Sequence, residues 1–206
     1  MNTPNPRPIN NPPQVVHLQP GDALIVVDVQ NDFLPGGSLA VPHGDEVVAV
    51  LNRYIAAFQA RSLPVYATRD WHPADHCSFQ PQGGPWPPHC IANTPGAQFA
   101  AGLQLLPSAT IISKATQADK DAYSGFEGTD LDARLRAAAV KRLFIGGLAT
   151  DYCVFNTVKD ARSHGYQVFL LEDAIRAVNV QPNDGVKAER AMIAQGAVPV
   201  ERKMLS

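Results

Sequence analysis

Residues 142–164 read RLFIGGLATDYCVFNTVKDARSH, and they predict a buried strand that runs directly into a helix. RLFIG is apolar enough for a strand that is covered on both faces, and VFNTVKDARSH is expected to be helical. Cys153 stands in the turn between them. Free cysteines are commonly small residues of the core, so a role for this thiol depends on what the rest of the chain brings to the same place.

Strands and helices alternate on both sides of this stretch. Further apolar runs predict strands at 23–28, 64–68, 110–114, 166–172 and 197–200. Helices are predicted at 44–61, 130–140 and 187–196. Alternation of this kind produces right-handed crossovers around a parallel sheet. We therefore expect an α/β protein whose residues 21–206 form one domain, a three-layer αβα sandwich with a mostly parallel sheet of about six strands.

The composition argues against several classes of function. The chain has 206 residues, a formal net charge of −2 and three cysteines. A charge this close to zero offers no general electrostatic attraction to nucleic acid or to an anionic membrane. No apolar run approaches the ~20 residues of a membrane span, and the first residues lack the apolar segment of a secretory signal. An odd number of cysteines does not suggest a disulfide framework, so we expect a cytoplasmic protein that binds neither nucleic acid nor membrane.

Residues 1–20 differ in composition from the rest of the chain. They contain six prolines and several asparagines, which favours an extended arm over a regular element. We expect this arm either to be flexible or to pack on a partner subunit. The sequence leaves open whether the protein forms a homo-oligomer.

Four residues with charged or reactive side chains end or follow the first four predicted strands. They are Asp28, Asp70, Lys114 and Cys153. In open parallel sheets, ligands bind outside the carboxyl ends of the strands. Each residue alone has an ordinary explanation, because a carboxylate can cap a turn, a lysine can end in solvent and a cysteine can lie in the core. Four of them at one edge of the sheet indicate a site.

Asp28, Lys114 and Cys153 together are suited to nucleophilic catalysis. The carboxylate can accept the thiol proton, and the ammonium group favours the ionised pair over the neutral one. The start of the following helix adds backbone N–H groups that suit a developing oxyanion. These residue types predict that Cys153 is a nucleophile.

A second set of polar residues lies in the segment 69–98, which is rich in Pro and Gly and too long for a simple connection. It contains Asp70, His72, His76 and His89. A carboxylate with imidazoles suits Zn²⁺, Fe²⁺ or Mn²⁺, so the segment predicts a site for a divalent metal ion. Two alternatives stay open from the residues alone: a structural zinc clip that uses Cys90 and two of the histidines, and surface histidines that bind no metal.

Five blocks of the sequence resemble, in the same order, those of a known family. They are VDVQNDFLPGGSLAV (27–41), RDWHPADHCSF (69–79), WPPHCIANTPGA (86–97), YSGFEGT (123–129) and GGLATDYCV (146–154). On these blocks the chain resembles the nicotinamidase branch of the isochorismatase-like cysteine hydrolases, over roughly residues 22–202. Five ordered blocks are far more specific than any one motif.

The resemblance implies roles for the residues at the strand ends. Asp28, Lys114 and Cys153 match the catalytic triad of the family. The backbone amides of Ala149 and Cys153 match its oxyanion hole. The bond between residues 148 and 149 corresponds to a cis peptide that precedes the nucleophile.

The resemblance also implies the metal ligands and the substrate pocket. Asp70, His72 and His89 match the metal ligands, and His76 stands where some members have a fourth ligand and others do not. Five residues are implied to line the pocket around a flat substrate ring: Phe33, Trp86, Tyr123, Leu148 and Tyr152. Tyr152 replaces a histidine that occurs in some relatives, a departure that bears on selectivity.

The activity implied by the resemblance is the metal-dependent hydrolysis of nicotinamide to nicotinate and ammonia through a cysteine thioester. Pyrazinamide is expected as a second substrate, and the pathway is the salvage of NAD. One alternative is a related cysteine hydrolase that acts on another small amide, such as N-carbamoylsarcosine. The other is a non-catalytic binding protein that retains the fold.

Overall fold

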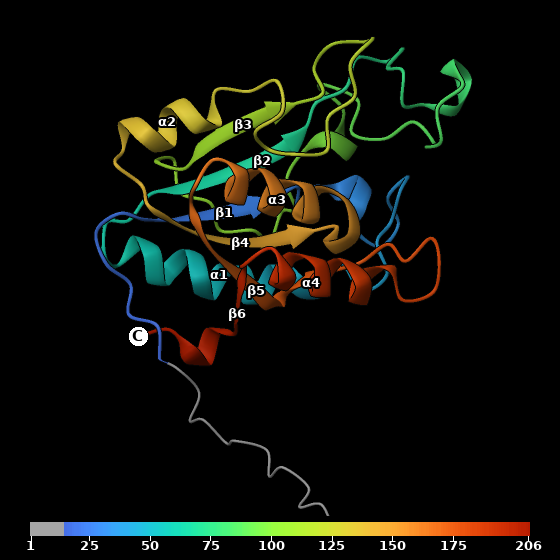
Figure 1. The fold of residues 1–206 in the computed structure, drawn as a ribbon. Coiled ribbons are helices and arrows are strands. Elements are labelled where there is room, and N and C mark those ends of the chain that lie inside the picture. The colour runs from blue at the N-terminus through green and yellow to red at the C-terminus, as the bar shows by residue number, and fades with distance from the viewer. Residues whose placement is uncertain (1–14) are drawn as a thin grey trace, which may run out of the picture.

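The computed structural model describes residues 15–206, and it contains a parallel sheet of six strands in the order β3-β2-β1-β4-β5-β6 (Figure 1). The strands are β1 (Asp22–Val27), β2 (Val65–Asp70), β3 (Thr110–Lys114), β4 (Arg142–Leu148), β5 (Gln167–Arg176) and β6 (Val198–Val200). The order reverses between β1 and β4. Such a switch point is where open α/β sheets bind their ligands.

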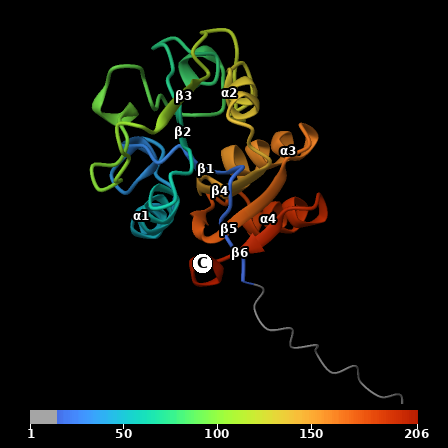
Figure 2. The same ribbon diagram turned by 90° about the vertical axis from the view of Figure 1, so that its left-hand side faces the viewer.

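The sheet lies between two layers of helices (Figure 2). Within residues 15–206 the α-helices are α1 (Glu46–Gln59), α2 (Leu131–Ala137), α3 (Phe155–Ser163) and α4 (Asp184–Ala194). α1 packs on one face of the sheet, and the other three helices pack on the opposite face. The structure confirms the predicted three-layer αβα sandwich.

The core explains why β1 is apolar at nearly every position. Leu24 and Val26 of β1 belong to the cluster on the α1 side, whereas Ile25 and Val27 belong to the cluster under α2 and α3. Side chains alternate between the two faces of a strand, so a strand that is covered on both faces needs a continuous apolar run. All six residues of β1 are buried.

The carboxyl edge of the sheet carries the four residues singled out by the sequence. Asp28 directly follows β1 with a φ of 49°, and Asp70 and Lys114 are the last residues of β2 and β3. After β4 the chain passes through a cis peptide between residues 148 and 149. It then forms one π-helical turn, Thr150–Val154, which carries Cys153 into α3. The cis bond implied by the family resemblance is therefore present.

Differences from the predicted elements lie at their ends. β5 continues to Arg176 because β4 also continues to Leu148, and these two residues are register partners. The helix predicted at 130–140 ends at Ala137, since Ala139 has a φ of 54° and cannot continue a right-handed helix. α4 begins at Asp184, earlier than predicted.

The amino-terminal part of the described chain lies beside its carboxyl terminus. The Val16 N–H donates to the Met204 carbonyl at 2.8 Å, and the Ser206 N–H donates to the Val16 carbonyl at 3.2 Å. Residues 1–14 of the predicted arm lie outside the described residues, so the arm stays a prediction.

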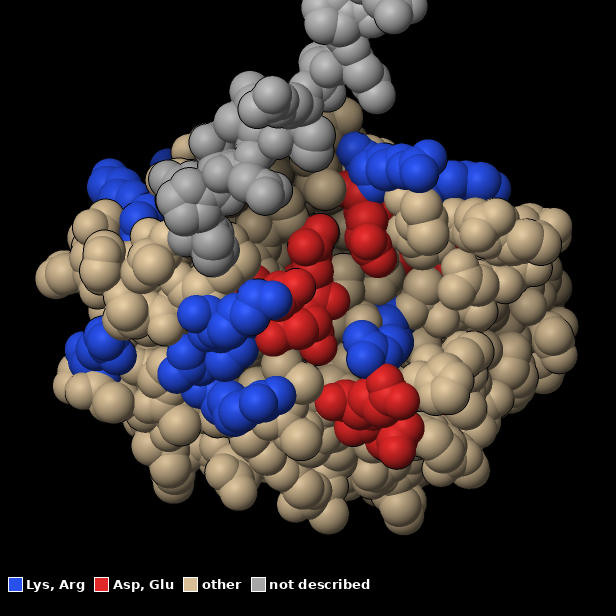
Figure 3. All heavy atoms as spheres, turned by 90° about the horizontal axis from the view of Figure 1, so that it is seen from below, with Lys and Arg blue, Asp and Glu red and all other residues tan. Residues whose placement is uncertain are grey.

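In the described part of the chain no helix is both long and apolar enough to span a membrane. On the face seen in Figure 3, Lys and Arg side chains lie next to Asp and Glu side chains.

Candidate active site

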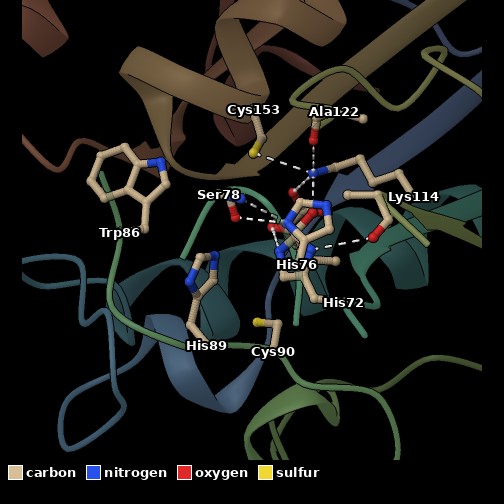
Figure 4. A network of polar contacts seen from close by, with 12 residues as sticks. His72, His76, Ser78, Trp86, His89, Cys90, Lys114, Ala122 and Cys153 are labelled. Atoms are coloured by element: carbon tan, nitrogen blue, oxygen red, sulfur yellow. Dashed lines mark hydrogen bonds and ion pairs between the residues drawn. The ribbon is translucent and has the colours of Figure 1, made fainter. Parts of the chain in front are cut away.

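Lys114 is buried at the end of β3, and its ammonium group is the centre of the site (Figure 4). Nζ lies 3.0 Å from Oδ2 of Asp28 and 3.4 Å from Sγ of Cys153, and it also pairs with Oδ1 of Asp70. A further hydrogen bond reaches the Ala122 carbonyl at 3.3 Å. Burial by itself would lower the pKa of Lys114, but the two carboxylates outweigh it and raise the pKa well above its usual value. The ammonium group is therefore charged.

Asp28 is placed to accept a proton from the thiol. Its Oδ1 accepts a hydrogen bond of 2.6 Å from the Thr68 hydroxyl. Within residues 15–206 its Oδ2 has no aligned hydrogen-bond donor, although Lys114 Nζ lies close by. A carboxylate oxygen of Asp28 and the sulfur of Cys153 are within 4.8 Å of each other. Burial raises the pKa of Asp28, while Lys114 and Thr68 act in the opposite direction, and a raised pKa makes the carboxylate a stronger base.

Cys153 is buried in the π-helical turn between β4 and α3. Burial raises the pKa of the Cys153 thiol well above its usual value, and Lys114 offsets only part of this effect. The sequence suggested that Lys114 would favour an ionised thiol. Lys114 does act in this direction in the structure, but burial outweighs it, so we expect the thiol to need a base for the removal of its proton.

Asp70, His72 and His89 come together as the sequence predicts for metal ligands. One ligand atom from each residue lies within 4.8 Å of the others, and all three residues are buried. Burial lowers the pKa of His89 and so favours the neutral imidazole that binds metals. The pKa of Asp70 is also lowered, because Lys114 and His72 outweigh the effect of burial. The shifts of Asp70 and His89 therefore favour the deprotonated groups that bind a cation.

The hydrogen bonds of the two histidines leave one nitrogen of each ring for a metal. His72 Nδ1 lies 3.3 Å from the Ala115 carbonyl, and His89 Nδ1 lies 2.8 Å from the Pro87 carbonyl. A ligating imidazole typically donates its other N–H to such an acceptor. His72 Nε2 is buried and has no hydrogen-bond partner in the described chain. This nitrogen, a carboxylate and a second imidazole form a donor set that fits a divalent metal ion.

His76 is adjacent to this set, but its ring nitrogens are engaged elsewhere. Its Nδ1 lies 2.8 Å from the Ser78 hydroxyl, and its Nε2 lies 3.0 Å from the Lys120 carbonyl. Its ring packs against that of His72, with centroids 4.2 Å apart. The described geometry therefore brings together three candidate ligands, and a bond from His76 to the same metal ion would require this residue to give up one of its two hydrogen-bond partners.

Cys153 and the three candidate metal ligands, Asp70, His72 and His89, all line one cavity whose wall is mostly apolar and aromatic. Trp86 Nε1 donates a hydrogen bond of 2.9 Å to the Tyr123 hydroxyl, and the Trp86 ring meets that of Tyr152 edge-on. The lining residues are Phe33, Leu39, Val41, Asp70, His72, Ser78, Trp86, His89, Asp121, Ala122, Tyr123, Ala149, Tyr152, Cys153 and Val178. A flat, largely apolar ligand with few polar groups matches such a wall.

One predicted pocket residue lies elsewhere, and several lining residues were missed. Leu148 is fully buried in the core cluster on the α1 side and is not among the lining residues, because a β4 side chain at this position points into the core. Leu39, Val41 and Val178 line the cavity without having been predicted. Val178 follows the end of β5, so the rule that ligands bind at the carboxyl ends of parallel strands could have identified it from the sequence. Leu39 and Val41 stand in loops that carry no such signal.

The fold and the site together define a protein of the α/β class in which a buried thiol lies beside a buried carboxylate and a buried ammonium group at the carboxyl edge of a parallel sheet. The model of the isochorismatase domain matches residues 22–202. The chain belongs to the isochorismatase family.

Three of the proteins that are similar to this chain bear on its activity. A nicotinamidase from Escherichia coli is 42% identical over 199 residues, which cover 86% of this chain and 93% of the relative. The structure of a Pyrococcus horikoshii pyrazinamidase in complex with zinc has 51% identity and a TM-score of 0.85. The alignment covers 88% of this chain and 99% of the pyrazinamidase chain. The structure of an L. infantum protein in complex with nicotinate has 36% identity and a TM-score of 0.86. The alignment covers 93% of this chain and 98% of the L. infantum chain.

Proposed function

We propose that this protein is a nicotinamidase, which hydrolyses nicotinamide to nicotinate and ammonia. The observation that carries the proposal is a single cavity that is lined both by a buried thiol and by the three candidate metal ligands. A thiol can attack a carboxamide, and a metal beside it can hold a ring nitrogen. The similarity to a nicotinamidase, to a zinc-bound pyrazinamidase and to a protein bound to nicotinate supports the same substrate class.

In the first half of the reaction, Asp28 removes the Cys153 proton as the sulfur attacks the carboxamide carbon. The amides of Ala149 and Cys153, two lining residues, are proposed to hold the oxyanion. Asp28, now protonated, delivers its proton to the departing nitrogen. Ammonia leaves, and the acyl group remains on sulfur as a thioester.

In the second half, a water molecule takes the place of ammonia, and Asp28 removes its proton as it attacks the thioester. The carbon–sulfur bond breaks, and the proton held by Asp28 returns to the thiolate. Lys114 stays charged throughout, since its two carboxylate partners raise its pKa. Its positive charge lowers the pKa of Asp28 and of Cys153 and so offsets part of the effect of burial, because a nearby opposite charge favours the ionised forms.

Asp70, His72 and His89 are proposed to hold the divalent metal ion, with zinc, iron and manganese as candidates. When bound, the ion supplies a Lewis-acid contact for the pyridine nitrogen and so orients the ring. The chain supplies the rest of the orientation through the aromatic wall of Phe33, Trp86, Tyr123 and Tyr152. We propose that Tyr152, in place of a histidine, makes one side of the pocket more apolar.

An ammonia-release assay on a small panel tests the proposal. The panel contains nicotinamide, pyrazinamide, benzamide and N-carbamoylsarcosine. The proposal predicts turnover of the first two well above that of the others. Preferential turnover of N-carbamoylsarcosine would support a different cysteine hydrolase, and no turnover of any amide by metal-loaded protein would support a binding role.

A further inference from the structure

Gln30 is a fully buried amide whose hydrogen bonds are directed at the backbone of a metal ligand. Its Nε2 donates to the Asp70 carbonyl at 2.7 Å and to the Ala97 carbonyl at 2.9 Å. Its Oε1 accepts from the Asp70 N–H at 2.8 Å. Both main-chain groups of Asp70 are thus bound by one side chain, which an amide can do because it carries a donor and an acceptor together.

The need for this clamp follows from the way β1 ends. The Asp28 N–H still donates to the Thr68 carbonyl at 3.2 Å, as in a parallel ladder. The next bond of such a ladder would run from the Asp70 N–H to the Asp28 carbonyl. That carbonyl instead accepts the Gln30 N–H at 2.8 Å, because the chain turns away at Asp28. The Gln30 side chain therefore makes the main-chain hydrogen bond at Asp70 that β1 no longer provides.

Asp32, two residues further along the chain, binds the main chain beside the histidines in a similar way. Its Oδ2 accepts a hydrogen bond of 2.7 Å from the Cys90 N–H, and Cys90 directly follows His89. The Cys90 carbonyl in turn accepts the His72 N–H at 3.0 Å. Oδ1 of Asp32 accepts bonds from the hydroxyl and N–H of Ser38 at 3.0 and 3.3 Å, which hold the carboxylate in place.

We propose that Gln30 and Asp32 are positioning residues of the metal site. By binding the main chain at Asp70 and at Cys90, they hold the three ligands together before the metal arrives, and they touch neither the metal nor the reacting atoms. Groups that orient ligands in this way strengthen metal binding, and their loss typically weakens it about 10- to 100-fold. The inference rests on the metal site of the proposed function, and it adds two residues that are not ligands.

The experiment compares Gln30→Glu, Gln30→Met and Asp32→Asn with the wild type. Gln30→Glu keeps the shape but places an oxygen against the Asp70 and Ala97 carbonyls. Zinc affinity of the metal-free proteins is measured by competition with a chromophoric chelator, at a temperature where all are folded. Thermal unfolding of the same metal-free samples is recorded separately. We expect zinc binding at least about 10-fold weaker in each variant.

Asn52 provides a matched control, because its amide also binds the backbone at two points. It donates to the Gly102 carbonyl and accepts the Gln104 N–H, both at 2.8 Å, and it contacts none of the candidate ligands. Asn52→Leu should lower the unfolding temperature and leave zinc affinity unchanged. A purely structural role for Gln30 and Asp32 would give their variants the same signature as this control.

Wild-type zinc affinity in folded Gln30→Glu and Asp32→Asn would overturn the inference, even if Gln30→Met is too unstable to purify. Failure of the wild type to bind zinc would overturn it together with the metal site. If the wild type binds zinc but hydrolyses no amide, the proposed function fails, and weakened binding in the variants still supports the positioning role.

Discussion

Asp70 and Lys114 are register partners at the ends of β2 and β3, and their side chains form an ion pair. One of them is a candidate metal ligand, and the other contacts both Asp28 and Cys153. The pair therefore joins the candidate metal site to the proposed nucleophile without an intervening residue. Its geometry follows from the sheet, since adjacent strands place register partners side by side.

Removal of the buried cation should damage both stability and catalysis. Lys114→Met leaves Asp28 and Asp70 without their shared partner, and an uncompensated buried charge costs about 3–5 kcal/mol. The loss should be largest at neutral pH and smaller in acid, where Asp28 takes up a proton. Urea unfolding at both pH values checks the prediction. The exposed Arg134, which pairs with Asp130, provides a control: Arg134→Met should change stability little.

Cys153→Ala should abolish hydrolysis, because no other group supplies the thioester. Loss of a nucleophile can cost about 10⁴-fold or more in kcat. The small change at a turn should leave the circular dichroism spectrum and unfolding midpoint close to those of the wild type. Ammonia release gives the activity. Appreciable turnover by the purified variant would exclude the thioester mechanism.

The acid limb of the pH profile should report Asp28. The carboxyl group must be ionised to act as a base, so kcat/KM should fall as the pH drops through its raised pKa. Thr68→Val removes a hydrogen bond that lowers this pKa, so the limb should move to higher pH. Asp28→Asn should reduce kcat by roughly 10²-fold or more. A limb that stays in place in Thr68→Val would argue against Asp28 as its origin.

The metal should matter most for substrates that carry a ring nitrogen. Benzamide has the same carboxamide on a ring of similar shape but offers the metal no ligand. Removing the metal with a chelator, or His72→Ala, should therefore reduce the preference for nicotinamide over benzamide far more than it reduces benzamide turnover. The ratio of the two kcat/KM values, with and without metal, measures this. Equal losses for both amides would indicate a structural clip or a metal-made nucleophile instead.

Local sequence determined the order of the elements and the residues at the strand ends. The apolar run 23–28 and the helical spacing in 44–61 are recognisable within short windows, because a strand buried on both faces needs a continuous apolar run and a helix buried on one face needs a helical period. The rule that ligands bind at the carboxyl ends of parallel strands then places Asp28, Asp70 and Lys114 at one edge. The fold class and this grouping were therefore predictable from the sequence, and the structure confirms both.

Only the tertiary structure decided what each of these groups touches. The strand order makes Lys114 a neighbour of Asp70, turns the Thr68 hydroxyl toward Asp28 and brings Gln30 to the backbone of a residue 40 positions away. The raised pKa of the Cys153 thiol and the engagement of both His76 nitrogens depend in the same way on packing. Hydrogen-bond partners and desolvation are properties of groups that meet across long stretches of chain, and no local pattern in the sequence records them.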